Sequence, residues 1–141
     1  MPAQDLARDV GAFITEYNRV FNALSGLSPG GARPRAGELA ALYHTPCVTV
    51  RADGSVICLQ SPPELERFFQ TVADTHYEDG YRSSHCADLE VVPLGTRSVL
   101  ASVTWSLLRA DGSLLKQWRQ SYTLIRDAPR WRILASVFHI H

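Results

Sequence analysis

The sequence lacks an excess of charge of either sign, and it lacks a long apolar run. Fourteen basic and fourteen acidic residues give a formal net charge of zero. Nucleic-acid-binding proteins usually carry a basic surplus, so this composition argues against a nucleic-acid partner. No run approaches the roughly 18 apolar residues of a membrane span, and no apolar signal core precedes Phe13. We therefore expect a cytoplasmic protein without a nucleic-acid or membrane partner.

The sequence is also poor in motifs for metals, disulfides and phosphates. Cys47, Cys58 and Cys86 are odd in number and lack close paired spacing, which favours reduced thiols over a disulfide framework or a zinc site. His139 and His141 leave the same face of a strand, but two ligands are too few for a metal site. There is neither a P-loop nor a Gly-x-Ser-x-Gly nucleophile motif. We expect neither a metal nor another cofactor.

Three segments are expected to be helical. Apolar residues recur at spacings of three and four from Leu6 to Leu24, which predicts an amphipathic helix. Glu38 to Tyr43 predicts a short second helix. Ser61 and Glu64 have the spacing of a capping box at the start of a third helix, which Gly80 ends.

The remaining segments are expected to form strands and loops within one domain, residues 1–141. The glycine- and proline-rich segment Ser25 to Gly37 predicts a surface connection, or alternatively a flap over a pocket. Asp53-Gly54 predicts a hairpin turn that pairs Val50 with Ile57. A long strand is expected from Tyr81 to Val92.

The segment from Val99 to His141 predicts three antiparallel strands. With Asp111 and Gly112 as loop residues, Trp105 lies opposite Trp118, Val103 opposite Gln120 and Ala101 opposite Tyr122. Since side chains alternate along a strand, these pairs share one apolar face. A four-residue turn, 127–130, pairs Arg126 with Trp131 and places His139 opposite Trp118.

The strand before them can be aligned in two ways. Pairing Val92 with Ser98 places His85 beside Trp105 on the apolar face. The competing register turns Asp88 and Glu90 inward, and burying two unpaired carboxylates costs several kcal/mol, so we favour the first. A bulge would reverse this choice.

These elements resemble the nuclear transport factor 2-like superfamily, in particular its SnoaL-like branch. The matching pieces are fold motifs: Val103–Trp105, Arg109–Gly112, Trp118–Leu124 and Trp131–Leu134. The resemblance implies an α+β fold, a cone-shaped half barrel in which about three helices pack on the concave face of a curved, mostly antiparallel sheet. It also implies a cavity, and members include isomerases, cyclases, dehydratases and non-enzymatic binding proteins.

Six residues on the apolar face are candidates for a small-molecule site. His85 is the candidate acid or base and Tyr122 the candidate oxyanion donor. The candidate ligand-binding residues are Trp105, Trp118, Gln120 and His139. The alternative interpretation is that these are ordinary core residues, and His139 is equally compatible with a subunit contact.

The active sites of the resembling enzymes are not reproduced residue by residue. The resemblance to ketosteroid isomerases implies a carboxylate base at the end of the first strand, where this chain has Val50-Arg51-Ala52. The resemblance to SnoaL-type cyclases implies a late acidic residue, where it has Gln120 or Tyr122. The Asp-Arg-Asp set of epoxide hydrolases cannot be assembled, and scytalone dehydratase is the nearest match in residue type only.

Three functions therefore remain open. The first is a protein that binds a small, largely apolar molecule. The second is a cofactor-independent isomerase, dehydratase or cyclase that uses His85. The third is a non-enzymatic interaction protein, and we expect a homodimer through the convex sheet face. That face is predicted to carry Leu100, Ser102, Thr104, Ser106, Arg119, Ser121, Thr123, Leu134, Ser136 and Phe138.

Overall fold

The computed structural model describes residues 3–25, 36–127 and 129–140, and these ranges contain three helices and six strands. Their bounds are α1 Ala3–Ser25, α2 Gly37–Ala40, β1 Tyr43–Val50, β2 Val56–Leu59, α3 Pro62–Glu78, β3 Ser83–Leu94, β4 Ser98–Leu108, β5 Leu114–Asp127 and β6 Arg130–Phe138. Most of the predicted connection or flap, Ser25 to Gly37, lies outside the described residues. No described helix is long and apolar enough to cross a membrane.

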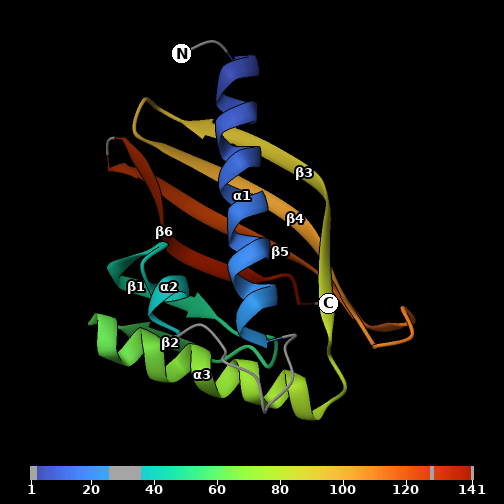
Figure 1. The fold of residues 1–141 in the computed structure, drawn as a ribbon. Helices are drawn as coiled ribbons and strands as arrows, with labels where there is room; N and C mark the ends of the chain where they lie inside the picture. The colour runs from blue at the N-terminus through green and yellow to red at the C-terminus, as the bar shows by residue number, and fades with distance from the viewer. Residues whose placement is uncertain (1–2, 26–35, 128, 141) are drawn as a thin grey trace.

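The strands form one curved sheet in the order β2-β1-β6-β5-β4-β3. All neighbours are antiparallel except β1 and β6, which are parallel. Figure 1 shows α1 crossing in front of the long strands, while α3 lies along the end of the molecule that carries β1 and β2. The predicted α+β fold with a curved, mostly antiparallel sheet is confirmed.

The helices form where the apolar periodicity predicts them. The inward stripe of α1 includes Val10, Ile14 and Tyr17, all buried. The backbone N–H of Glu64 donates to Oγ of Ser61 at 3.4 Å, so the predicted helix cap is present. The second helix is shorter than predicted, because the chain from Tyr43 onward already pairs with β6.

Both Asp-Gly hairpins use the same five residues, Arg-Ala-Asp-Gly-Ser. The closing pairs are Arg51 with Ser55 and Arg109 with Ser113, each with an N–H to C=O distance of 2.8 Å. The loop therefore holds three residues, with its glycine in the left-handed region, rather than the two expected. In the first hairpin this moves the register by one residue, so the predicted pairing of Val50 was wrong.

The predicted register of β4 with β5 is confirmed away from the turn. Trp105 pairs with Trp118 and Ala101 pairs with Tyr122, because an irregularity between Leu107 and Leu108 offsets the longer loop. Side chains of β4 alternate between buried and partly exposed along its whole length. One face of this hairpin therefore packs against the core.

The predicted inward orientation of His85 is wrong. His85 pairs with Ser106 and is exposed, whereas its neighbour Cys86 pairs with Trp105 and packs against the core. A register shift between Ala87 and Glu90 causes this reversal.

Beyond the bulge, the side chains lie on the faces that the favoured register predicts, but Val92 pairs with Leu100, so its predicted pairing with Ser98 is wrong. Val91 packs against the core, while Asp88 and Glu90 remain exposed. Asp88 has a φ of 56°, a conformation in which Asp and Asn are enriched among non-glycine residues. Since the bulge inserts one residue, the side chains upstream of it change face.

A second bulge changes the face of the last residues of β6. Leu124 pairs with Ile133 and Arg126 with Trp131 as predicted, but the register shifts between Thr123 and Leu124. The predicted placement of His139 opposite Trp118 is therefore wrong.

The second bulge changes which residues near the end of β6 face the interior. Ser136 is buried and Phe138 half-buried, and both border the cavity instead of lying on the convex face. His139 is exposed, and its Nε2 lies 2.7 Å from Oγ of Ser121 on the outer side of the sheet. The convex face predicted from the sequence therefore loses Ser136 and Phe138.

Candidate functional site

A cavity of about 590 Å³ lies between the concave face of the sheet, α1 and α3. Apolar and aromatic side chains provide most of its wall, as is usual for small-molecule sites. Its lining residues are Tyr17, Phe21, Tyr43, Thr49, Arg51, Ala52, Asp53, Phe68, Phe69, Thr71, Val72, Thr75, His76, Trp105, Leu107, Lys116, Gln117, Trp118, Gln120, Tyr122, Ser136 and Phe138.

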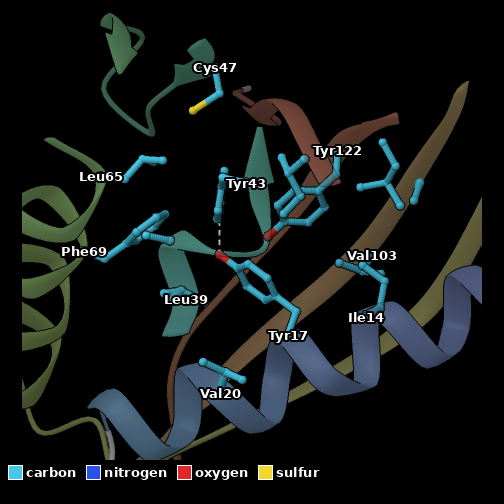
Figure 2. Close-up of a cluster of buried hydrophobic side chains, with 14 of the residues drawn as sticks. Ile14, Tyr17, Val20, Leu39, Tyr43, Cys47, Leu65, Phe69, Val103 and Tyr122 are labelled. Carbon is cyan, nitrogen blue, oxygen red and sulfur yellow. Dashed lines mark hydrogen bonds between the residues drawn. The ribbon is translucent and has the colours of Figure 1, made fainter. Parts of the chain in front are cut away.

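Three tyrosines from three different elements converge at the buried end of this cavity. Tyr17 on α1 and Tyr43 on β1 share a hydrogen bond of 2.7 Å between their hydroxyls (Figure 2). Nε1 of Trp105 donates to the hydroxyl of Tyr122 at 2.9 Å. The Tyr17 ring lies 5.7 Å from that of Tyr122, so the hydroxyls form one compact polar group inside an aromatic wall.

Burial keeps all three tyrosines protonated. Loss of solvation raises the pKa of Tyr17 to about 12, and it raises the pKa values of Tyr43 and Tyr122 well above their usual range. A phenolate in this position would be charged in a region with little water. The tyrosines can therefore donate hydrogen bonds to a ligand at neutral pH, but they cannot act as bases.

A second polar group runs from β5 to β6. Nε1 of Trp118 donates to Oε1 of Gln120 at 2.8 Å, and Nε2 of Gln120 donates to Oγ of Ser136. Gln120 and Ser136 are buried, at 6% and 2% exposure. These two hydrogen bonds satisfy both the oxygen and the nitrogen of the Gln120 amide, and they bring a serine hydroxyl to the cavity wall.

His76 is the imidazole that borders the cavity. It lies near the end of α3, half-buried, with its ring centroid 6.1 Å from Phe21 and 6.5 Å from Trp118. Its Nδ1 is buried and has no hydrogen-bond partner in the described part of the chain. Nε2 of the same ring is not among the fully buried atoms without a partner in the described residues.

The surroundings of His76 favour its neutral form. Burial lowers its pKa below 6.5, the positive charge of Lys116 lowers it further, and the negative charge of Asp79 opposes both. Nζ of Lys116 is itself bound to Oδ2 of Asp79 at 2.9 Å. At neutral pH, His76 is therefore an unprotonated base in contact with the cavity.

Charged lining residues occur only at exposed positions among the described residues. Arg51, Asp53 and Lys116 are all exposed, and Oδ1 of Asp53 accepts hydrogen bonds from Ser55 in its own turn. The buried wall is neutral. The cavity thus suits an uncharged ring compound with one or two polar atoms.

Four of the six residues predicted as a site border this cavity: Trp105, Trp118, Gln120 and Tyr122. His85 and His139 lie on the other side of the sheet and take no part in it. The cause is the same for both residues, since each follows or precedes a bulge that reverses the alternation of side chains.

The sequence prediction missed Tyr17, Tyr43, His76 and Ser136 as site residues. The apolar stripes of α1 and α3 do indicate inward faces for Tyr17 and His76, because each residue falls at helical spacing from core residues of its own helix. No local pattern distinguishes a cavity-facing position from a core position. The inward turn of Ser136 depends on a bulge and has no clear signal in the sequence.

No metal centre is visible in the described ranges, 3–25, 36–127 and 129–140: they contain no group of three His, Cys, Asp or Glu side chains that could hold an ion.

The comparisons with known proteins agree with this architecture. A family model described as NTF2-like protein (DUF6841) matches residues 8–140. Aln2 from a Streptomyces species is similar in structure, with 19% identity, a TM-score of 0.74 and coverage of 99% of this chain and 93% of that one. No curated protein matches the sequence.

Two further solved structures show how widely this fold is used. A putative scytalone dehydratase from Novosphingobium aromaticivorans has 12% identity and a TM-score of 0.64, covering 94% of this chain and 81% of its own. The yeast UBP3-associated protein BRE5 has 14% identity and a TM-score of 0.69, covering 100% and 99%. At these identities the likeness concerns the fold alone.

Proposed function

We propose that this chain, which belongs to the NTF2-like family DUF6841, binds a small, largely apolar molecule in the cavity beneath α1 and α3. The observation that carries this proposal is the combination of a 590 Å³ cavity with an aromatic wall and two buried, neutral polar groups. A volume of this size lies within the range of ligand sites, about 300–1,000 Å³.

The arrangement of the wall supports a flat ligand. Trp118 and Phe138 lie with their rings 5.3 Å apart and 14° from parallel, so they present aligned aromatic surface. Aromatic rings prefer to pair in offset-stacked or edge-to-face arrangements, which a flat aromatic ligand can adopt against this wall. The polar atoms lie at separate points of the wall, where they can orient a bound ring.

Filling the cavity is expected to abolish binding. Val72 is half-buried on α3 and borders the cavity, so a Val72→Trp side chain would occupy the ligand space. The fluorescent neutral compound N-phenyl-1-naphthylamine should bind the wild type, and its affinity should fall about tenfold or more in the variant, a loss of ~1.4 kcal/mol. Fluorescence titration measures both values.

Arg67→Trp provides the matched control for this titration. Arg67 is exposed on the same helix and does not border the cavity, so this substitution should leave probe affinity unchanged. A wild type that fails to bind the compound, or equal affinities for wild type and Val72→Trp, would contradict the proposed site.

A second candidate function, proton transfer on a bound carbonyl compound, is favoured by His76. The residue combines contact with the cavity, a lowered pKa and an unpartnered ring nitrogen. Groups with perturbed pKa values in a cavity are candidates for acid–base chemistry. In this candidate function His76 replaces His85, whose exposed position on the convex face excludes contact with the cavity.

We also propose a homodimer through the convex face of the sheet. Small side chains such as Ser102 and Ser121 lie at its centre, and Val48 and Val137 are each 39% exposed. Small residues let a second sheet approach closely, and a stable interface buries roughly 800 Å² per partner. Light scattering at micromolar concentration should give about twice the chain mass of 15.7 kDa.

An arginine on this face is expected to break the dimer. Ser121→Arg places a long charged side chain at the centre of the interface, so its solution mass should fall to that of one chain. Thr15→Arg, on the exposed side of α1, should stay dimeric. A wild-type protein of monomer mass would overturn the dimer without affecting the cavity.

A further inference from the structure

The chain of hydrogen bonds from Trp118 to Ser136 has a fixed direction. An indole N–H can only donate, so the group of Gln120 that faces Trp118 at 2.8 Å must be its carbonyl oxygen. The amide nitrogen of Gln120 then faces Ser136 and donates to its Oγ. The orientation of the Gln120 amide therefore follows from the fact that the indole N–H of Trp118 can only donate.

This direction leaves one proton without a partner. Oγ of Ser136 accepts from Gln120, so the hydroxyl hydrogen of Ser136 must point elsewhere. Ser136 is 2% exposed and borders the cavity, and in the described part of the chain its Oγ makes no hydrogen bond other than the one with Gln120. A buried donor without an acceptor is unfavourable because it has lost its bonds to water, and an acceptor on a ligand would remove this cost.

The position of Ser136 follows from the bulge in β6. The register shift after Ile133 turns Ser136 inward beside Thr49 of β1, where an unbroken strand would have turned Ala135 inward. Bulges of this kind commonly redirect a side chain next to a functional site. The bulge thus places this donor in the wall of the cavity.

We propose that the Ser136 hydroxyl, polarised by Trp118 through Gln120, is the donor that recognises a carbonyl oxygen on the ligand. The inference rests on the proposed function, since it names the chemical class of the molecule bound in the same cavity. Hydrogen bonds in a chain polarise one another, so a donor at the end of such a chain is stronger than an isolated hydroxyl.

The surroundings select an uncharged acceptor that brings no proton of its own. The buried lining residues around Ser136 are neutral, and the charged lining residues Arg51 and Lys116 are exposed. A carboxylate buried here would lack a cation. A ligand hydroxyl would bring a further proton that itself needs an acceptor, whereas a carbonyl oxygen only accepts. A ketone or similar carbonyl meets both conditions.

The test uses two probes that share a bicyclic skeleton, 1-tetralone with a carbonyl oxygen and tetralin without one. Their dissociation constants are measured by displacement of N-phenyl-1-naphthylamine from wild type and from Ser136→Ala. The affinity of 1-tetralone relative to tetralin should fall about 3- to 10-fold in the variant, as expected for one lost hydrogen bond. Because a general loss of affinity affects both probes equally, it does not change the ratio of their dissociation constants.

Two variants serve as controls. Ser113→Ala removes a serine hydroxyl from an exposed hairpin turn away from the cavity, and Ser136→Thr keeps a hydroxyl at the proposed position, so both should preserve the wild-type ratio. If both probes displace the fluorescent compound, and the affinity of 1-tetralone relative to tetralin is the same in Ser136→Ala as in wild type, the carbonyl subsite is overturned and the proposed function stands. Displacement by neither probe would overturn the proposed function itself, and the subsite with it.

Discussion

Replacing His76 by glutamine is expected to slow proton transfer on a bound ketone about 10²–10⁴-fold, the usual contribution of a positioned acid or base. A suitable reaction is the exchange of the α-protons of 2-tetralone in D₂O, followed by NMR. The C–H proton moves to Nε2 of His76, the electron pair moves to the carbonyl oxygen as an enolate, and a deuteron returns to the carbon. No cofactor or oxidant is needed for this exchange.

The pH dependence of the exchange provides a second readout. Burial lowers the pKa of His76 below 6.5, so the neutral imidazole is already the main form at and above that pH. The enzyme-dependent rate should be constant near pH 7 and should decline only as the pH falls below about 6.5 and His76 becomes protonated. A His76→Gln protein should lose this decline together with the rate.

The former candidate base supplies the matched control. His85 is exposed on the opposite side of the sheet, so His85→Gln should exchange 2-tetralone at the wild-type rate. Wild-type exchange no faster than that of buffer, or a His76→Gln protein as active as wild type, would remove catalysis from consideration. Ligand binding, measured separately with N-phenyl-1-naphthylamine, would be unaffected by that outcome.

The second large effect concerns stability. Trp105→Ala is expected to lower the free energy of unfolding by about 3–5 kcal/mol, because it removes a large buried side chain and leaves a void. Trp105 is 3% exposed, packs 5.8 Å from the Tyr17 ring and donates to Tyr122. Urea denaturation followed by circular dichroism measures the loss.

Trp118 makes an informative comparison with Trp105. The two residues face each other across β4 and β5, but Trp118 is only half-buried and its outer side already borders the cavity. Trp118→Ala should therefore cost clearly less stability than Trp105→Ala. Equal losses would mean that Trp118 is a core residue and that this part of the wall is not open to a ligand.

For the candidate site residues, prediction from the sequence failed at the two bulges. His85 and His139 were expected inside and lie outside, while Ser136 was expected outside and lies inside. Each reversal comes from one extra residue in a strand. Whether that residue is accommodated depends on contacts with distant segments, such as the packing of Val91 on the core, and no local pattern records them.

The sequence by itself determined the elements and the centre of the sheet. The stripe of α1 and the cap at Ser61 follow from spacings of three and four residues, and the Asp-Gly turn sets the hairpin in which Trp105 pairs with Trp118. Only the tertiary structure decided which polar side chains enter the cavity. His76 and Ser136 line the cavity because of helix packing and a bulge in β6. These features depend on burying apolar groups and exposing charges across the whole molecule at once.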